Sequence, residues 1–265
     1  TFIAADAIVT QADGDSVLSH STEAPIADLK AKRPIGGGSP NQTPEGDGMD
    51  PVFAAFASGE FYEAPALEMM RRWMPEGGVF VDIGAHVGNH TLFMLRHGGA
   101  GRAIPLEFNP RAIRAFNEMI KVNGLEDQID AEHLGLGLTE ERGKKEAFGS
   151  KKNLSNNRLR EGFVEKINTR PGDVLLRETD VDMVKIDVGG DERDVLKGMR
   201  KTMKRKRPVL VLDLTRPKSQ KALPLLGRLG YVERERAEWN DAEGDRVVAI
   251  FTSDRPAGEG GGGGD

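Results

Sequence analysis

The stretch Val79-Phe-Val-Asp-Ile-Gly-Ala-His-Val-Gly-Asn-His90 begins as an apolar strand and turns glycine-rich after Asp82. A short apolar run of this kind is typical of a strand that is buried on both faces of a parallel sheet. Gly84 and Gly88 allow backbone conformations and close approaches that a side chain would block. The stretch therefore predicts a buried strand and then a tight turn at which a ligand can approach the backbone.

Strand and helix patterns alternate on both sides of this stretch. Strands are predicted at 79–81, 103–108, 129–138, 181–187 and 208–214, and helices at 64–74, 90–96, 110–122, 192–203 and 220–229. Asn89 or Thr91 is expected to cap the second helix. A closing hairpin, 231–236 with 246–252, adds an antiparallel strand. Because parallel strands need crossover connections, the pattern predicts an α/β fold with a mostly parallel, seven-stranded sheet and helices on both faces.

The composition excludes several classes of protein. The 265 residues contain no cysteine, which rules out disulfides, thiolate nucleophiles and zinc sites built on cysteine. A net charge of -5 argues against a general nucleic-acid binder, and the basic run 199–207 is interpreted as the solvated end of a helix. No run of roughly 18 apolar residues is present to span a membrane. A cytoplasmic location is the default expectation, although a targeting segment before Thr1 remains an open question.

The chain divides into three parts. Residues 1–50 form an N-terminal extension that is partly irregular, residues 51–254 the α/β domain, and residues 255–265 a flexible glycine-rich tail. The polar segment 151–160 is either a solvated loop or a loop over the ligand pocket that recognises a substrate.

Two acidic residues indicate which ligand the glycine turn binds. Glu107 follows the second strand, about twenty residues after the turn, where a carboxylate can hold both ribose hydroxyls of a nucleoside. Asp82 stands where a dinucleotide-binding turn would have its first glycine, so it would repel a pyrophosphate and disfavours an NAD-dependent oxidoreductase. A carboxylate suits a cationic ligand, such as the sulfonium and ammonium groups of S-adenosylmethionine. The alternative is an ordinary strand-to-helix turn with Asp82 as a local cap.

Six motifs follow one another along the chain from about residue 59 to residue 252. They are 59–63 (GEFYE), 82–91 (DIGAHVGNHT), 107–110 (EFNP), 123–125 (NGL), 185–187 (KID) continuing into 191–198 (DERDVLKG), and 207–213 (RPVLVLD). In this order they resemble the FkbM-type S-adenosylmethionine-dependent methyltransferases, which have the class I, Rossmann-like fold. The family usually has Lys-Ile-Asp-x-Glu-Gly after the fourth strand, and here Gly189 replaces the glutamate.

The resemblance implies S-adenosylmethionine as the methyl donor, with the glycine turn around its methionine part and Glu107 on its ribose. The implied cofactor-binding residues are Asp82, Gly84, Ala85, His86, Gly88, Asn89, Thr91, Glu107, Asn109 and Asp187. It also implies O-methylation of a small hydroxylated acceptor, such as a sugar or a secondary metabolite, without a nucleic-acid or membrane partner. Because Gly189 removes an expected carboxylate, either Asp191 or Glu192 takes over its task or the protein binds the donor without catalysis.

Asp187 and His86 are the candidate catalytic residues. Asp187 ends the strand nearest the expected methyl group, and the His86 imidazole titrates near physiological pH, although packing beside the cofactor is the alternative role for His86. Lys185 lies in a buried strand and is expected to pair with a carboxylate, Asp213 or Glu192. No metal is predicted, but Asp187 and Asp213 close adjacent strands, and a Mg²⁺ site between them is an alternative hypothesis.

Overall fold

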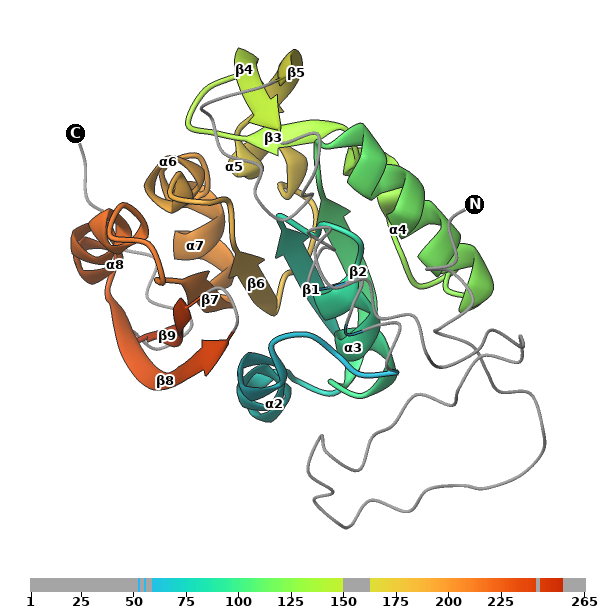
Figure 1. Ribbon diagram of the computed structural model, residues 1–265. Helices are drawn as coiled ribbons and strands as arrows, with labels where there is room; N and C mark the ends of the chain where they lie inside the picture. Colours follow the sequence, from blue (N-terminus) through green and yellow to red (C-terminus); the bar gives the residue numbers. More distant parts are fainter. Residues whose placement is uncertain (1–51, 53–54, 56–58, 150–162, 242–243, 255–265) are drawn as a thin grey trace.

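The computed structural model describes residues 52, 55, 59–149, 163–241 and 244–254 (Figure 1). The predicted N-terminal extension, the segment 151–160 and the predicted C-terminal tail lie outside these residues. No helix in the described part of the chain combines the length and the apolar character needed to cross a bilayer.

A six-stranded sheet organises the described residues. Its strand order is β2 (Ala100–Leu106), β1 (Gly78–Ile83), β6 (Met183–Ile186), β7 (Val209–Asp213), β9 (Gly244–Ser253) and β8 (Tyr231–Asp241). The first four strands are parallel to one another, whereas β9 is antiparallel to both β7 and β8. The predicted closing hairpin is confirmed, and the mostly parallel α/β fold is confirmed with it.

Helices cover both faces of this sheet (Figure 1). On one face, α2 (Ala64–Trp73), α3 (Asn89–Arg96) and α4 (Pro110–Val122) pack against a core that includes Phe80 and Met183. On the other face, α6 (Glu192–Lys197), α7 (Arg200–Lys206) and α8 (Leu223–Arg228) pack against a core that includes Val81 and Val184. Successive side chains of β1 and β6 thus enter opposite cores, which is why these strands are apolar without alternation.

The predicted strand 129–138 does not form in this sheet. Ile129 makes only an isolated parallel bridge to Ala103. The chain then enters a short 3₁₀ helix, Ala131–His133, before β3 (Leu136–Leu138). The expected seventh strand is therefore reduced to one bridge, and the described sheet has six strands.

A second sheet, which the sequence patterns do not predict, combines β3 with two strands that come later in the chain. Its order is β3, β5 (Phe163–Arg170) and β4 (Gly143–Gly149). β3 is parallel to β5, and β5 is antiparallel to β4. This small sheet lies beside the carboxyl ends of β1 and β2, where it adds a wall to the region in which a ligand is expected (Figure 1).

Two predicted helices are interrupted. The predicted helix 192–203 breaks into α6 and α7 around Gly198, where a Cβ atom would lie 2.2 Å from the carbonyl oxygen of Thr139. The predicted helix 220–229 begins as a 3₁₀ turn, Ser219–Ala222, and becomes α8. A further short helix, α5 (Gly172–Leu175), connects the second sheet to β6.

Candidate active site

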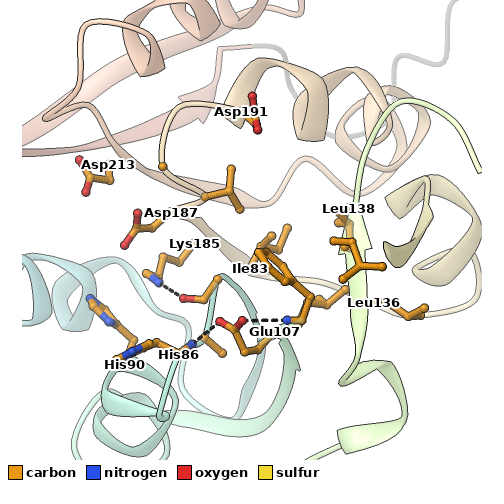
Figure 2. A pocket seen from close by; sticks show the side chains of 18 of the residues that line it. Ile83, His86, His90, Glu107, Leu136, Leu138, Lys185, Asp187, Asp191 and Asp213 are labelled. Carbon is orange, nitrogen blue, oxygen red and sulfur yellow. Dashed lines mark hydrogen bonds between the residues drawn. The ribbon is translucent and has the colours of Figure 1, made fainter. Parts of the chain in front are cut away.

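A cavity of about 200 Å³ lies at the carboxyl ends of the parallel strands. Its two ends differ in chemistry (Figure 2). Asp187, Asp213 and His90 lie at a polar end, and Leu136 and Leu138 of the second sheet lie at an apolar end. Glu107 lies between them, and His86 lies beside His90 on the polar side of Glu107. This is the edge of an open parallel sheet at which ligands bind.

The glycine turn brings the strand ends together. The backbone N–H groups of Gly84 and Ala85 both donate to the carbonyl oxygen of Leu106, at 2.9 and 3.1 Å, which joins the turn to β2. Gly84 has a φ of 83°, and a Cβ atom there would lie 1.9 Å from the carbonyl oxygen of Asp187. Only glycine therefore lets the ends of β1 and β6 come this close.

Gly88 joins the turn to α4 by close packing. Its φ is 96°, and a Cβ atom would lie 2.3 Å from Met119 Cε and 2.9 Å from Phe116 Cε2. We expect Gly88→Ala to lower the free energy of unfolding by about 1–3 kcal/mol, because it adds backbone strain and displaces two core side chains. Urea denaturation measures this loss. Gly124→Ala is the matched control, since Gly124 also has a positive φ but has no atom within 4 Å of its Cβ position. Equal losses in the two variants would disprove the packing contribution.

Asn89 and Thr91 do not cap α3, contrary to the prediction. The N-cap is Gly88, and no side chain caps the helix. Asn89 instead binds the backbone of Tyr62, accepting from its N–H at 3.0 Å and donating to its carbonyl oxygen at 2.9 Å. The Thr91 hydroxyl donates to Asp82 Oδ2 at 2.8 Å. Both side chains therefore hold neighbouring segments in place.

Asp82 and Lys185 form a buried ion pair beside the cavity. They are register partners on the parallel strands β1 and β6, and Lys185 Nζ lies 3.1 Å from Asp82 Oδ1. The ammonium group also donates to the carbonyl oxygen of Gly84 at 3.0 Å. Lys185 does pair with a carboxylate, but the predicted partners, Asp213 and Glu192, were wrong. Asp82 is fully buried and does not line the cavity, so its charge balances Lys185 and does not face a ligand.

Burial alone would lower the pKa of Lys185, yet attraction from Asp82, Asp187 and Glu63 raises that pKa above its ordinary value. Lys185 is therefore a permanent cation and does not act as a base.

Glu107 is fixed at the middle of the cavity by the backbone around it. Its Oε2 accepts from the N–H of His86 at 3.0 Å, and its Oε1 accepts from the N–H groups of Phe108 and Asn109 at 2.8 and 2.7 Å. A carboxylate offers about four lone-pair sites, so one remains available to a ligand. The Asn109 side chain caps α4 by accepting from the backbone N–H of Arg111, and it does not line the cavity.

The polar end contains a cluster of charged groups that the sequence analysis only partly anticipated. Glu63, at the start of α2, accepts from the guanidinium of Arg246 on β9, and it lies 3.3 Å from His90 Nε2. Arg246 also lies 3.7 Å from Asp213 Oδ2. Glu63 and Arg246 carried no prediction of their own, because their contacts depend on the register of the closing hairpin.

Burial sets the protonation of this cluster. Burial, with repulsion from Asp187, raises the pKa of Glu63 to about 7, although Arg246 opposes the rise. Burial, assisted by Lys185 and Arg246, holds the pKa of His90 well below its usual range, so His90 is neutral and its contact with Glu63 is not an ion pair. Burial and the nearby Asp187 also raise the pKa of Asp213.

The loop after β6 shows how the chain accommodates Gly189. Gly189 has a φ of 70°, and its carbonyl oxygen accepts from Arg216 Nη1 at 3.1 Å. Glu192 is buried away from the cavity, and its Oε1 accepts from the N–H of Gly190 at 2.9 Å. Asp191 lines the cavity but lies 2.5 Å from the ammonium of Lys218. Glu192 therefore does not supply the missing carboxylate, and Asp191 is the residue of the two that lines the cavity.

The structure brings together six of the predicted cofactor-binding residues and leaves four outside the cavity lining. Those that line it are Gly84, Ala85, His86, Asn89, Glu107 and Asp187. Those that do not are Asp82, Gly88, Thr91 and Asn109. The four outside residues hold the turn, the first strand and two helices in position, and thus support the cavity from behind.

The metal hypothesis is not supported by the site. Asp187 and Asp213 do follow adjacent parallel strands and both line the cavity. However, the guanidinium of Arg246 lies 3.7 Å from Asp213 Oδ2, so one of the two carboxylates already has a cation beside it. Among the described residues, no group of three or more His, Asp or Glu side chains is arranged to hold a metal ion.

Comparison with known proteins gives the family. The model of the methyltransferase FkbM domain matches residues 82–239, which is more than half of the chain. No curated protein matches significantly. Similar solved structures include the methyltransferase FkbM from Methylobacillus flagellatus KT, with 15% identity, a TM-score of 0.48, and coverage of 75% of this chain and 52% of that chain. The chain therefore spans about half the length of that protein.

Two further structures are described as tRNA methyltransferases. One is the m1A22 enzyme TrmK of B. subtilis, with 15% identity, a TM-score of 0.45, and coverage of 71% of this chain and 65% of that chain. The other is Sp1610 of Streptococcus pneumoniae, a candidate m1A22 enzyme in complex with S-adenosyl-L-methionine, with 14% identity, a TM-score of 0.49 and 71% coverage of each chain. The family assignment rests on the domain match, and by that match the chain belongs to the FkbM family of methyltransferases.

Proposed function

We propose that this protein transfers a methyl group from S-adenosylmethionine to a hydroxyl group of a small acceptor, such as a sugar or a secondary metabolite. The observation that carries the proposal is the position of Glu107. Three backbone N–H groups hold this carboxylate between an apolar and a polar end of one cavity. A nucleoside with an apolar base, a ribose and a charged tail matches this order of an apolar end, a central carboxylate and a polar end.

The residues present fit the donor. Glu107, with one accepting position left, suits a ribose hydroxyl, and the apolar end, with Leu136 and Leu138, suits the adenine ring. The polar end has three carboxylates, Glu63, Asp187 and Asp213, near the guanidinium of Arg246, and Lys185 is already balanced by Asp82. Arg216 also lines the cavity, where it donates to the carbonyl oxygen of Gly189. This acidic end suits the ammonium and sulfonium groups. When bound, the donor supplies an electrophilic methyl group on its sulfur.

The polar end also favours a hydroxylated acceptor. Carboxylates accept hydrogen bonds from O–H groups, and several of them around one end of a cavity orient a polyol or a phenol by such bonds. Methyl transfer is an in-line displacement, so alignment of the hydroxyl oxygen is the main contribution that the cavity walls make. His86 lines the cavity on the Glu107 side, and its predicted catalytic role remains a proposal.

A second candidate function is binding of the donor without catalysis. The observation in its favour is Gly189, which contributes no carboxylate to the loop that lines the cavity. Glu63, Asp187 and Asp213 nevertheless give the polar end more carboxylates than donor binding alone requires. The enzyme is therefore the better supported of the two functions.

Two measurements test the proposal. In calorimetric titrations, S-adenosylmethionine and S-adenosylhomocysteine should bind while NAD does not, and tight binding of NAD alone would refute the donor assignment. A labelled-methyl assay against methyl glycosides, catechol and flavonoid phenols, with transfer RNA as a separate arm, then identifies the acceptor class. Donor binding with no labelled product from any hydroxylated compound would favour the non-catalytic function. Transfer of the label to RNA would show that the acceptor is RNA and not a small molecule.

A further inference from the structure

We infer that Glu63 is the general base that takes the proton from the acceptor hydroxyl during methyl transfer. This inference rests on the proposed function and assigns its chemistry to a residue of α2, outside both the glycine turn and the strand that ends at Asp187. It replaces the candidate catalytic residues of the sequence analysis in the role of base.

The fold fixes Glu63 at the wall of the cavity. It precedes α2 in the left-handed conformation, with a φ of 59°, and its carbonyl oxygen accepts from the N–H groups of Ala66 and Leu67. The N–H and the carbonyl oxygen of the preceding residue, Tyr62, are both bonded to the Asn89 side chain. Glu63 lines the cavity although only 8% of its surface is exposed. A rotation of the segment that would remove its carboxylate from the cavity is therefore opposed at both ends.

Charged and titratable groups face Glu63 from each element that surrounds it. They are His90 on α3, Lys185 on β6, Asp187 after β6, Asp213 on β7 and Arg246 on β9. Arg246 is the direct partner, and it stabilises the ionised carboxylate that a base requires. His90 is neutral and lies 3.3 Å away, close enough to orient the carboxylate without competing for the proton.

Three other charged residues at the cavity are less suited to accept a proton. Glu107 already accepts three backbone N–H bonds and lies toward the ribose position. Lys185 remains cationic beside Asp82. Asp213 already accepts a backbone N–H bond, from Thr215 to its Oδ1 at 2.7 Å.

The proton affinity of Glu63 is appropriate for the task. Burial and the nearby Asp187 raise the pKa of Glu63 to about 7, which is near the pH at which a general base works best. In the step, the acceptor O–H bond breaks and its proton goes to the Glu63 carboxylate, while the oxygen forms a bond to the methyl carbon. The S–CH₃ bond of the donor breaks, and the donor leaves as the neutral thioether. One positive charge is lost at sulfur and one negative charge at the carboxylate, so the step is balanced.

Glu63→Gln provides the first test, because glutamine keeps the shape of the side chain but cannot take the proton. We expect kcat for labelled-methyl transfer to catechol, or to the best acceptor of the screen, to fall by about a hundredfold or more. The rising limb of kcat near pH 7 should also disappear, while the affinity for S-adenosylhomocysteine in calorimetry changes little. Glu60→Gln, an exposed neighbour in the same segment, is the matched control and should behave as wild type.

Arg246→Gln tests the assignment in a way that a structural role would not reproduce. Because Arg246 lowers the pKa of Glu63, its removal should shift the rising limb of kcat to higher pH. If Asp187→Asn removes the limb and Glu63→Gln does not, Asp187 is the base and the inference is wrong.

An arm that needs no acceptor completes the design. In proteins labelled with ¹³C at the glutamate carboxyl carbon, the resonance missing from Glu63→Gln should titrate near pH 7 in the wild type. A titration below pH 5 would overturn the inference, whether or not an acceptor has been found. Failure of donor binding in the wild type would instead contradict the proposed function, so the two failures are distinguishable.

Discussion

Replacing Lys185 by Met is expected to lower the free energy of unfolding by about 3–5 kcal/mol, because it leaves a buried carboxylate without its counter-charge. Asp82 has no exposed surface, and Lys185 is 5% exposed. After the substitution, the Thr91 hydroxyl would be the remaining side-chain partner of Asp82 that is described here, at 2.8 Å. Urea denaturation followed by far-UV circular dichroism measures the loss.

The double variant Asp82→Asn with Lys185→Met separates the ion pair from packing. If the loss comes from the uncompensated charge, neutralising Asp82 should recover most of it, since a buried ion pair contributes little net stability over a neutral pair. Lys121→Met is the control for a surface pair: Lys121 lies 3.0 Å from Glu118 with both side chains exposed, and its loss should change stability by less than about 1 kcal/mol. Equal effects of Lys185→Met and Lys121→Met would contradict the role of burial.

The Asp82–Lys185 pair shows how far sequence patterns predict this molecule. The apolar strands and the glycine turn were evident, because both depend on neighbouring residues. The pairing was not, because it requires the register between β1 and β6, which places Asp82 opposite Lys185. From the sequence, the position of Asp82 near the end of a strand suggests a ligand contact. The register instead places its carboxylate opposite Lys185, inside the protein.

The same limit explains the polar end of the cavity. Asp187 was predicted because it ends a strand, and a strand end is visible in the sequence. Arg246 lies near the start of β9, and its contact with Glu63 depends on the antiparallel pairing of β7 with β9. Glu63 was recognised only as part of a motif, because nothing local shows that the residue before a helix points into a cavity.

The second sheet was missed for a different reason. β4 has the sequence Gly-Lys-Lys-Glu-Ala-Phe-Gly, in which charged residues do not alternate with apolar ones. A strand of this kind is stabilised by its pairing with β5 over the full strand and not by burial of one face. Leu136 and Leu138 were assigned to the main sheet, yet β3 pairs with β5 and brings them to the apolar end of the cavity.

Glu107→Ala is expected to weaken binding of S-adenosylmethionine by about tenfold or more. Loss of a charged hydrogen bond to the ribose corresponds to about 1.5–3 kcal/mol, and each 1.4 kcal/mol is a factor of about ten in affinity. Calorimetric titration measures the change, and adenosine should lose affinity by a similar factor because it carries the same ribose. Glu126 is an exposed acidic residue that follows α4. Glu126→Ala is therefore the control and should leave affinity unchanged.

Glu107→Gln separates the ribose contact from the architecture of the turn. Both carboxylate oxygens accept backbone N–H groups, from His86 on one side and from Phe108 and Asn109 on the other. An amide has only one accepting oxygen, so its NH₂ group would face an N–H donor whichever way it is turned. We therefore expect Glu107→Gln to weaken donor binding and also to lower the unfolding temperature, despite its similar shape. If either variant folds normally and binds S-adenosylmethionine as tightly as the wild type, the ribose lies elsewhere and the donor orientation proposed for the cavity is wrong.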